Sequence, residues 1–150
     1  MKIPSWTYKY DLEKNRNEYH KIIDKVFDSG RLIFGEQLEN FESEFSKYIG
    51  VNYGLGCDNA INGIFLSLKA LGIKNKDKVI TVPNTAIPTV SAIRQAGGEP
   101  LFVDINKHGL METKNIEKLI NKQVRFIIPV HLYGFPCDMF EVISIAKKYN

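Results

Sequence analysis

Short apolar runs alternate with amphipathic stretches through the last two thirds of the chain, and this alternation constrains the fold more than any other feature. The runs KVITV (residues 78–82) and VRFIIPV (124–130) are almost continuously apolar. Such runs are typical of parallel strands that helices cover on both faces. The sequence therefore predicts an α/β fold with a mostly parallel sheet and helices on both faces. We expect strands near Tyr53–Gly56, Val79–Val82, Leu101–Val103 and Arg125–Val130, followed in turn by helices over 60–71, 84–96, 111–121 and 137–150.

The first 50 residues carry a purely helical pattern. Apolar side chains at helical spacing predict helices over 12–27 and 38–49, which end near Gly30 and Gly50. No Gly/Ser/Pro-rich linker divides the chain, and 150 residues are about one domain's worth. We therefore expect a helical segment over 1–50 and alternating strands and helices over 51–150.

The charge balance argues against nucleic acid as a partner. The net charge of +3 comes from 20 basic and 17 acidic residues that are scattered along the chain, without a basic tract or arm. No stretch approaches the ~20 uninterrupted apolar residues of a membrane span, and the N-terminus has no apolar leader. We expect a cytoplasmic protein without a membrane partner, in which Cys57 and Cys137 are free thiols.

The stretch GLGCDNAINGIF (54–65) raises the question of a phosphate site. A helix that begins near Ala60 leaves the N–H groups of its first turn unpaired, and the helix dipole favours an anion there. The small residues before it would let a phosphate approach, and Asn59 could cap the helix or donate a hydrogen bond. The alternative is that Asp58 or Asn59 only caps a core helix. The spacing matches neither common glycine-rich nucleotide motif, so both interpretations stay open.

Polar loops follow the predicted strands, at the edge where ligands bind in open parallel sheets. We single out His131, which follows the most apolar strand and could reach into such a crevice. The alternative is a structural histidine, because no second histidine lies nearby in sequence to form a metal pair. Asp104 and Asp138 fit turn and cap roles better. The sequence therefore predicts no metal site.

Several stretches taken in order resemble one family. SGRLIFGEQLENFESEFSKYIG, DKVITVPNTAIPTVSAIRQAGGEPLFVDI and IIPVHLYGFPCDM are similar to the DegT/StrS nucleotide-sugar aminotransferases, from about Ile3 to the last residue. These are pyridoxal-phosphate enzymes of the aspartate-aminotransferase fold (fold type I). The resemblance implies that residues 1–150 form the N-terminal part of the large, cofactor-binding domain.

The resemblance also implies roles for individual residues. Asn59, Ala60 and Ile61 match the turn that holds the cofactor phosphate through main-chain N–H groups. The family usually has Gly and Thr where this chain has Ala60 and Ile61, so a hydroxyl contact is lost while the backbone donors remain. Ala86 stands where the family usually has an aromatic ring that stacks on the pyridine, and alanine cannot stack. His131 matches a position near the cofactor.

The family's Schiff-base Lys, its Asp to the pyridine nitrogen and the neighbouring Gln come in segments later than residue 150. The resemblance therefore implies no catalytic residue among these 150 residues, which alone would be inactive. The implied whole enzyme is a homodimer that aminates a keto nucleotide sugar for surface polysaccharide such as O-antigen, with a donor such as glutamate. The alternatives are an inactive truncated or degenerate homologue, and a small phosphate- or nucleotide-binding α/β module.

Overall fold

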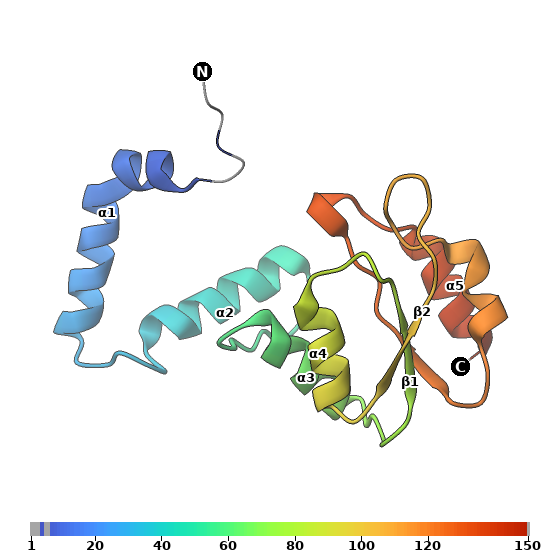
Figure 1. Ribbon diagram of the computed structural model, residues 1–150. Coiled ribbons are helices and arrows are strands. Elements are labelled where there is room, and N and C mark those ends of the chain that lie inside the picture. Colours follow the sequence, from blue (N-terminus) through green and yellow to red (C-terminus); the bar gives the residue numbers. More distant parts are fainter. Residues whose placement is uncertain (1–3, 5–6, 150) are drawn as a thin grey trace. The chain divides into compact units, whose positions relative to one another are not determined.

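The computed structural model describes residue 4 and residues 7–149. The chain divides into two compact units, Met1–Gly56 and Cys57–Asn150, and each is considered by itself. The first unit contains helices α1 (Lys9–Asp28) and α2 (Glu36–Ile49), labelled in Figure 1. Both confirm the helices predicted over 12–27 and 38–49. Gly50 ends α2 in the left-handed conformation, φ 81°, and its N–H donates to Lys47 and Ser46. Glycine adopts that conformation without a Cβ penalty.

The strand expected at Tyr53–Gly56 is absent, and this prediction was wrong. The segment packs on α2 instead, where the Gly56 N–H donates to Glu42 Oε1 at 2.6 Å. A Cβ added to Gly54 would lie 2.8 Å from the Glu42 carbonyl oxygen, and one on Gly56 would lie 2.6 Å from Leu38 Cδ1. The two glycines therefore allow a close approach of backbone to helix. The two glycines of the segment thus serve a tertiary contact and do not mark a strand.

The second unit is built on a parallel sheet of three strands in the order β2-β1-β3. These strands are β1 (Lys78–Thr81), β2 (Glu99–Phe102) and β3 (Val124–Ile127). Strand β1 is central, with Lys78 opposite Glu99 of β2 and opposite Val124 of β3. The other three predicted strands and their parallel arrangement are therefore confirmed.

Helices cover both faces of this sheet, as the almost continuous apolar runs predicted. Helices α3 (Ala60–Ala70) and α4 (Ile87–Gln95) belong to one face, and α5 (Met139–Tyr149) to the other (Figure 1). Consecutive residues of β1 face opposite ways. One core cluster joins Val79 to buried residues of the α3 and α4 side, Leu68, Ile73, Ile93 and Ala96. The other joins Ile80 to residues that include Val82, Val103, Met111, Ile116, Val142 and Ile145.

The helix predicted over 111–121 is wrong. Two 3₁₀ turns, Thr113–Asn115 and Glu117–Leu119, replace it. Met111 forms an isolated antiparallel bridge with Ile105, which holds its backbone extended, and Ile120 is extended again (ψ 127°). The backbone is therefore extended on both sides of residues 112–119, and two 3₁₀ turns form between these points.

Side chains fasten these turns to α5. The Thr113 hydroxyl donates to Glu141, and Lys148 Nζ lies 2.9 Å from Glu117 Oε1. The hydrogen bond and the charge of Glu117 raise the pKa of Lys148.

Candidate functional site

The sheet order creates a topological switch point between β1 and β3. The chain leaves β1 through α4 to reach β2, and then passes back beyond β1 through the 3₁₀ turns to reach β3. These connections belong to opposite faces, because α4 and the turn residue Ile116 lie in different core clusters. The adjacent carboxyl ends of β1 and β3 are therefore the place where ligands generally bind in sheets of this kind. The Thr81 hydroxyl donates to the Ile128 carbonyl at 3.0 Å and joins the two ends.

Side-chain hydrogen bonds also order the loops at this edge. Asn84 Nδ2 donates to the Gly109 carbonyl at 3.1 Å and so ties the loop after β1 to the loop after β2. Gly109 has φ 77°, and a Cβ there would lie 3.2 Å from Asn84 Nδ2. The hydroxyls of Thr85 and Thr89 are 2.8 Å apart. These hydrogen bonds therefore hold the loops at the carboxyl edge in a defined conformation.

The predicted phosphate turn is the N-terminus of α3. Asn59 is the N-cap, and its Oδ1 accepts the N–H of Asn62 at 2.9 Å. The capping interpretation is therefore correct, but it uses only one of the first-turn donors. The N–H groups of Ala60 and Ile61 have no partner within the helix, as at any helix start. Capping and anion binding are compatible here.

Asp58 adds a negative charge close to these donors. Its carboxylate accepts hydrogen bonds from Asn59 Nδ2 at 2.9 Å and from Asn62 Nδ2 at 2.8 Å. The charge opposes an incoming phosphate, and the two amide donors offset part of that repulsion. The α3 dipole and the amides of Ala60 and Ile61 work in the other direction.

Ala86 precedes α4 and presents only a methyl group. Its backbone is extended (φ −69°, ψ 149°), and no side chain caps the helix, which begins at Ile87. The helix expected over 84–96 thus begins later than predicted, at Ile87, and Pro88 lies in its first turn. Ala86 is exposed at the carboxyl edge. No aromatic ring is present at this position.

His131 follows β3 and is oriented by a backbone donor. Its Nδ1 accepts the N–H of Cys137 at 3.0 Å. The Cys137 thiol is buried and donates to the Val130 carbonyl at 3.1 Å. Asp138 caps α5, as expected, because its Oδ1 accepts the Glu141 N–H at 3.1 Å. Sequence reasoning singled out His131 but missed its hydrogen bond with Cys137, because that contact depends on how the loop folds back.

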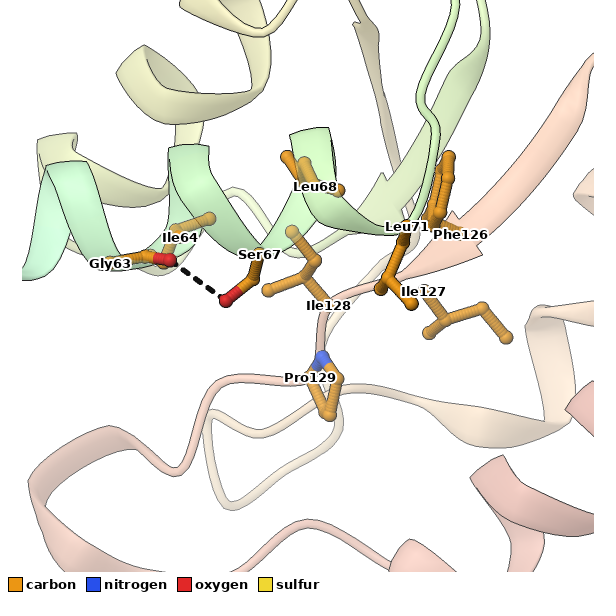
Figure 2. Close-up of a pocket in the computed structure, with 9 residues that line it drawn as sticks. All are labelled: Gly63, Ile64, Ser67, Leu68, Leu71, Phe126, Ile127, Ile128 and Pro129. Carbon is orange, nitrogen blue, oxygen red and sulfur yellow. Dashed lines mark hydrogen bonds between the residues drawn. The ribbon is translucent and has the colours of Figure 1, made fainter. Parts of the chain in front are cut away.

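The structure also contains an apolar cleft that the sequence did not indicate. The cleft has a volume of about 300 Å³ and opens between α3 and the β3 segment (Figure 2). The Ser67 hydroxyl in its wall donates to the Gly63 carbonyl at 2.8 Å. The lining is Gly63, Ile64, Ser67, Leu68, Leu71, Phe126, Ile127, Ile128 and Pro129. None of the predicted site residues lines this cleft. The sequence feature that could have indicated the cleft is the unbroken apolar run at the end of β3.

The expected site residues thus fall into two groups. Ala86 and His131 follow the adjacent strands β1 and β3, at the switch point. Asn59, Ala60 and Ile61 form the first turn of α3, which packs against α4. Within residues 4 and 7–149, no group of three or more His, Cys, Asp or Glu side chains could hold a metal ion. No helix of that part of the chain is long and apolar enough to cross a membrane.

The fold defines a class of protein, an open α/β sheet with a topological switch point and a helix start whose first two N–H groups have no partner within the helix. The particular family follows from comparison with known proteins. The model of the DegT/DnrJ/EryC1/StrS aminotransferase family matches residues 13–150. The chain therefore belongs to this family.

Individual relatives agree with the family match. A dTDP-3-amino-3,4,6-trideoxy-alpha-D-glucose transaminase of Micromonospora megalomicea subsp. nigra is 40% identical over 144 residues, 95% of this chain and 38% of its own length. The crystal structure of DesV from S. venezuelae superposes with a TM-score of 0.94 at 33% identity, covering 98% of this chain and 40% of that one. The structure of NtdA from Bacillus subtilis, with bound cofactor PMP, gives a TM-score of 0.88 at 32% identity over 91% of this chain and 32% of its own. The chain thus spans about two fifths or less of each relative.

These comparisons confirm the aminotransferase fold and the family's pyridoxal-phosphate cofactor. The described residues fit that cofactor in part. The unpaired amides of Ala60 and Ile61 at the start of α3 fit a phosphate. The methyl group of Ala86 does not fit a pyridine ring in the way an aromatic side chain would.

Proposed function

We propose that this chain is the N-terminal portion of a pyridoxal-phosphate-dependent aminotransferase that transfers an amino group to a keto nucleotide sugar. The observation that carries the proposal is the α3 turn, Asn59–Ile61, beside a switch point in a chain of this family. Relatives named as nucleotide-sugar transaminases and as a GDP-perosamine synthase support the substrate class. The product would be an amino sugar for surface polysaccharide.

Four residues of the chain have a defined part in this proposal. The Ala60 and Ile61 N–H groups bind the cofactor phosphate, and the α3 dipole adds attraction. Asn59 holds the first turn in shape through its bond to Asn62. His131, which follows β3, would lie near the cofactor. Bound pyridoxal phosphate supplies the aldehyde and the electron-withdrawing ring on which an amino group is carried.

The proposal assigns the remaining chemistry to a longer polypeptide. The Lys that holds the cofactor covalently and the Asp at its ring nitrogen belong to later segments in this family. We therefore propose a cytoplasmic homodimer for the complete enzyme, with residues 1–50 at or near the subunit interface. Its partners are a nucleotide-linked keto sugar and an amino donor such as glutamate, without nucleic acid or membrane. Sequencing the gene beyond codon 150 tests this assignment, and a reading frame without these two residues would contradict it.

Cofactor binding by the 150-residue chain is the direct test. Two or three main-chain hydrogen bonds, each worth about 1 kcal/mol net, correspond to an affinity no better than roughly millimolar. Titration with pyridoxal phosphate should shift the amide NMR signals of Ala60 and Ile61. Borohydride reduction followed by mass spectrometry should find adducts spread over surface lysines. A stoichiometric adduct at one lysine would contradict the assignment of the covalent Lys to a later segment.

Ala86 favours a second candidate, a catalytically inactive homologue whose cofactor site has decayed. The two candidates differ in the same titration. An inactive homologue should leave the Ala60 and Ile61 amides unmoved by pyridoxal phosphate at millimolar concentration. If inorganic phosphate shifts them as strongly as pyridoxal phosphate does, the α3 turn serves as a general phosphate site, which is the third alternative.

A further inference from the structure

We propose that Cys137 is a positioning residue that holds His131 as a neutral Nε2–H donor at the carboxyl edge of the sheet. This inference rests on the proposed function only for the identity of the ligand that the Nε2–H group would bind. The hydrogen bonds themselves are a property of the chain without any ligand. Nothing in the family match assigns a role to Cys137.

The first step is the identity of the donor in the bond between the two residues. The Cys137 backbone N–H points at His131 Nδ1 over 3.0 Å. A backbone nitrogen can only donate, so Nδ1 must accept through its lone pair. A neutral imidazole carries one N–H, so its proton is on Nε2. The bond therefore selects one of the two neutral tautomers.

The second step is what keeps the Cys137 amide in place. The Cys137 side chain is 5% exposed and belongs to the core cluster under α5. Its thiol donates to the carbonyl of Val130, the residue before His131, at 3.1 Å. Both hydrogen bonds start from Cys137, one to the His131 side chain and one to the Val130 backbone. Together they close residues 130–137 into a loop. Because the Gly134 N–H also donates to the His131 carbonyl at 3.1 Å, the backbone at His131 is held as well.

The third step is the location of the Nε2–H donor. His131 is exposed, and within the described residues of the second unit its Nε2 has no hydrogen-bond partner. The residue follows β3, beside the end of β1, so it lies at the switch point. A fixed, uncharged N–H donor at this place suits an oxygen of a bound phosphate ester or carbonyl compound. In the proposed aminotransferase it would orient the cofactor or its substrate.

NMR of the unliganded chain tests the positioning role. In the wild type, the His131 side-chain nitrogens should show an unprotonated Nδ1 and a protonated Nε2. A ¹⁵N–¹⁵N coupling across the hydrogen bond should connect Nδ1 to the Cys137 amide. Two tautomers in exchange, or an absent coupling, would overturn the proposal.

Two substitutions of Cys137 separate the effect of the thiol hydrogen bond from the effect of side-chain packing. Cys137→Ser keeps a donor for the Val130 carbonyl, so the coupling and the single tautomer should persist. Cys137→Ala removes the donor, so the coupling should fall and the Nδ1 signal should move toward the average of both tautomers. The amide spectrum reports whether each variant is folded. An alanine variant that is folded and has wild-type imidazole signals would show that the thiol does not position His131.

Adding pyridoxal phosphate distinguishes this inference from the proposed function. If the Ala60 and Ile61 amides and the His131 Nε2–H signal all shift, the donor serves the ligand. Shifts at the two amides without a shift at Nε2–H would overturn the ligand role of His131. If no signal responds, the proposed cofactor function fails, while the tautomer result of the unliganded protein still stands.

Discussion

Individual residues decide how strongly this chain can hold a phosphate. The first turn of α3 offers two unpaired amides, and Ala60 is the first helical residue. Proline is well tolerated at this position, since its missing N–H has no helical partner. Asn59 has φ −161° and ψ 168°, which is compatible with a following proline. The site therefore allows one donor to be removed without breaking the helix.

We expect Ala60→Pro to weaken phosphate binding and to leave stability nearly unchanged. The loss of one hydrogen bond to an anion, about 1 kcal/mol, corresponds to roughly fivefold lower affinity for pyridoxal phosphate. Titration by NMR and urea denaturation measure the two quantities. Asn59→Ala serves as the comparison for stability, because loss of the cap should lower the free energy of unfolding by about 1 kcal/mol, whereas the proline variant should lose little. Equal affinities of the wild type and the proline variant would exclude the Ala60 amide as a ligand.

A ring at position 86 should restore what the chain lacks for the cofactor. Ala86 is exposed beside the switch point, so a larger side chain can be accommodated there. We expect Ala86→Phe to bind pyridoxal phosphate about fivefold more tightly, since an aromatic pair adds about 1 kcal/mol beyond its buried area. Ala86→Leu adds bulk without a ring and serves as the control. A leucine variant that gains as much as the phenylalanine variant would argue against stacking.

At the scale of elements, the sequence predicted what depends on local pattern. The apolar runs of β1 and β3 and the spacing in α1 and α2 identified these elements correctly. Gly54 and Gly56 were misassigned because their role is a tertiary contact with α2. The helix over 111–121 was misassigned because the bridge of Met111 to Ile105 overrides a helical pattern. The cap by Asn59 was predictable, whereas the contact of His131 with Cys137 depends on how the loop folds back.

The turn between α4 and β2 shows how tightly elements approach. Gly98 is buried, and a Cβ there would lie 2.7 Å from Ile73 Cδ1 and 3.3 Å from Ile93 Cγ2. We expect Gly98→Ala to lower the free energy of unfolding by about 1–3 kcal/mol through overpacking. Adding Ile73→Val removes the clashing methyl group, so the double variant should lose less than the sum of the single variants. Urea denaturation measures this, and strict additivity would locate the clash elsewhere.

At the scale of the whole molecule, the cleft along β3 leaves apolar surface exposed. Strand β3 is an edge strand among the described residues, and Leu71 in the cleft wall is 70% exposed. An unprotected apolar edge favours pairing with another chain. We therefore expect the 150-residue chain to self-associate as its concentration rises.

Substitution in the cleft should reverse this association. Leu71→Lys places a charge in the wall shown in Figure 2 and should reduce the associated fraction in sedimentation velocity runs. Leu66→Lys is the control, since Leu66 lies in α3, which Leu71 caps, and is 47% exposed but does not line the cleft. Equal effects of both substitutions would indicate that association does not use the cleft.

The central place of β1 also sets an order of events during folding. Lys78 pairs with Glu99 in β2 and with Val124 in β3. The loops to be closed are about 20 and about 45 residues long, so the second pairing costs about 0.7 kcal/mol more chain entropy. The unit β1–α4–β2 should therefore form first and serve as the template on which β3 docks. Pulse-labelling hydrogen exchange would then find the amides of β2 protected before those of β3.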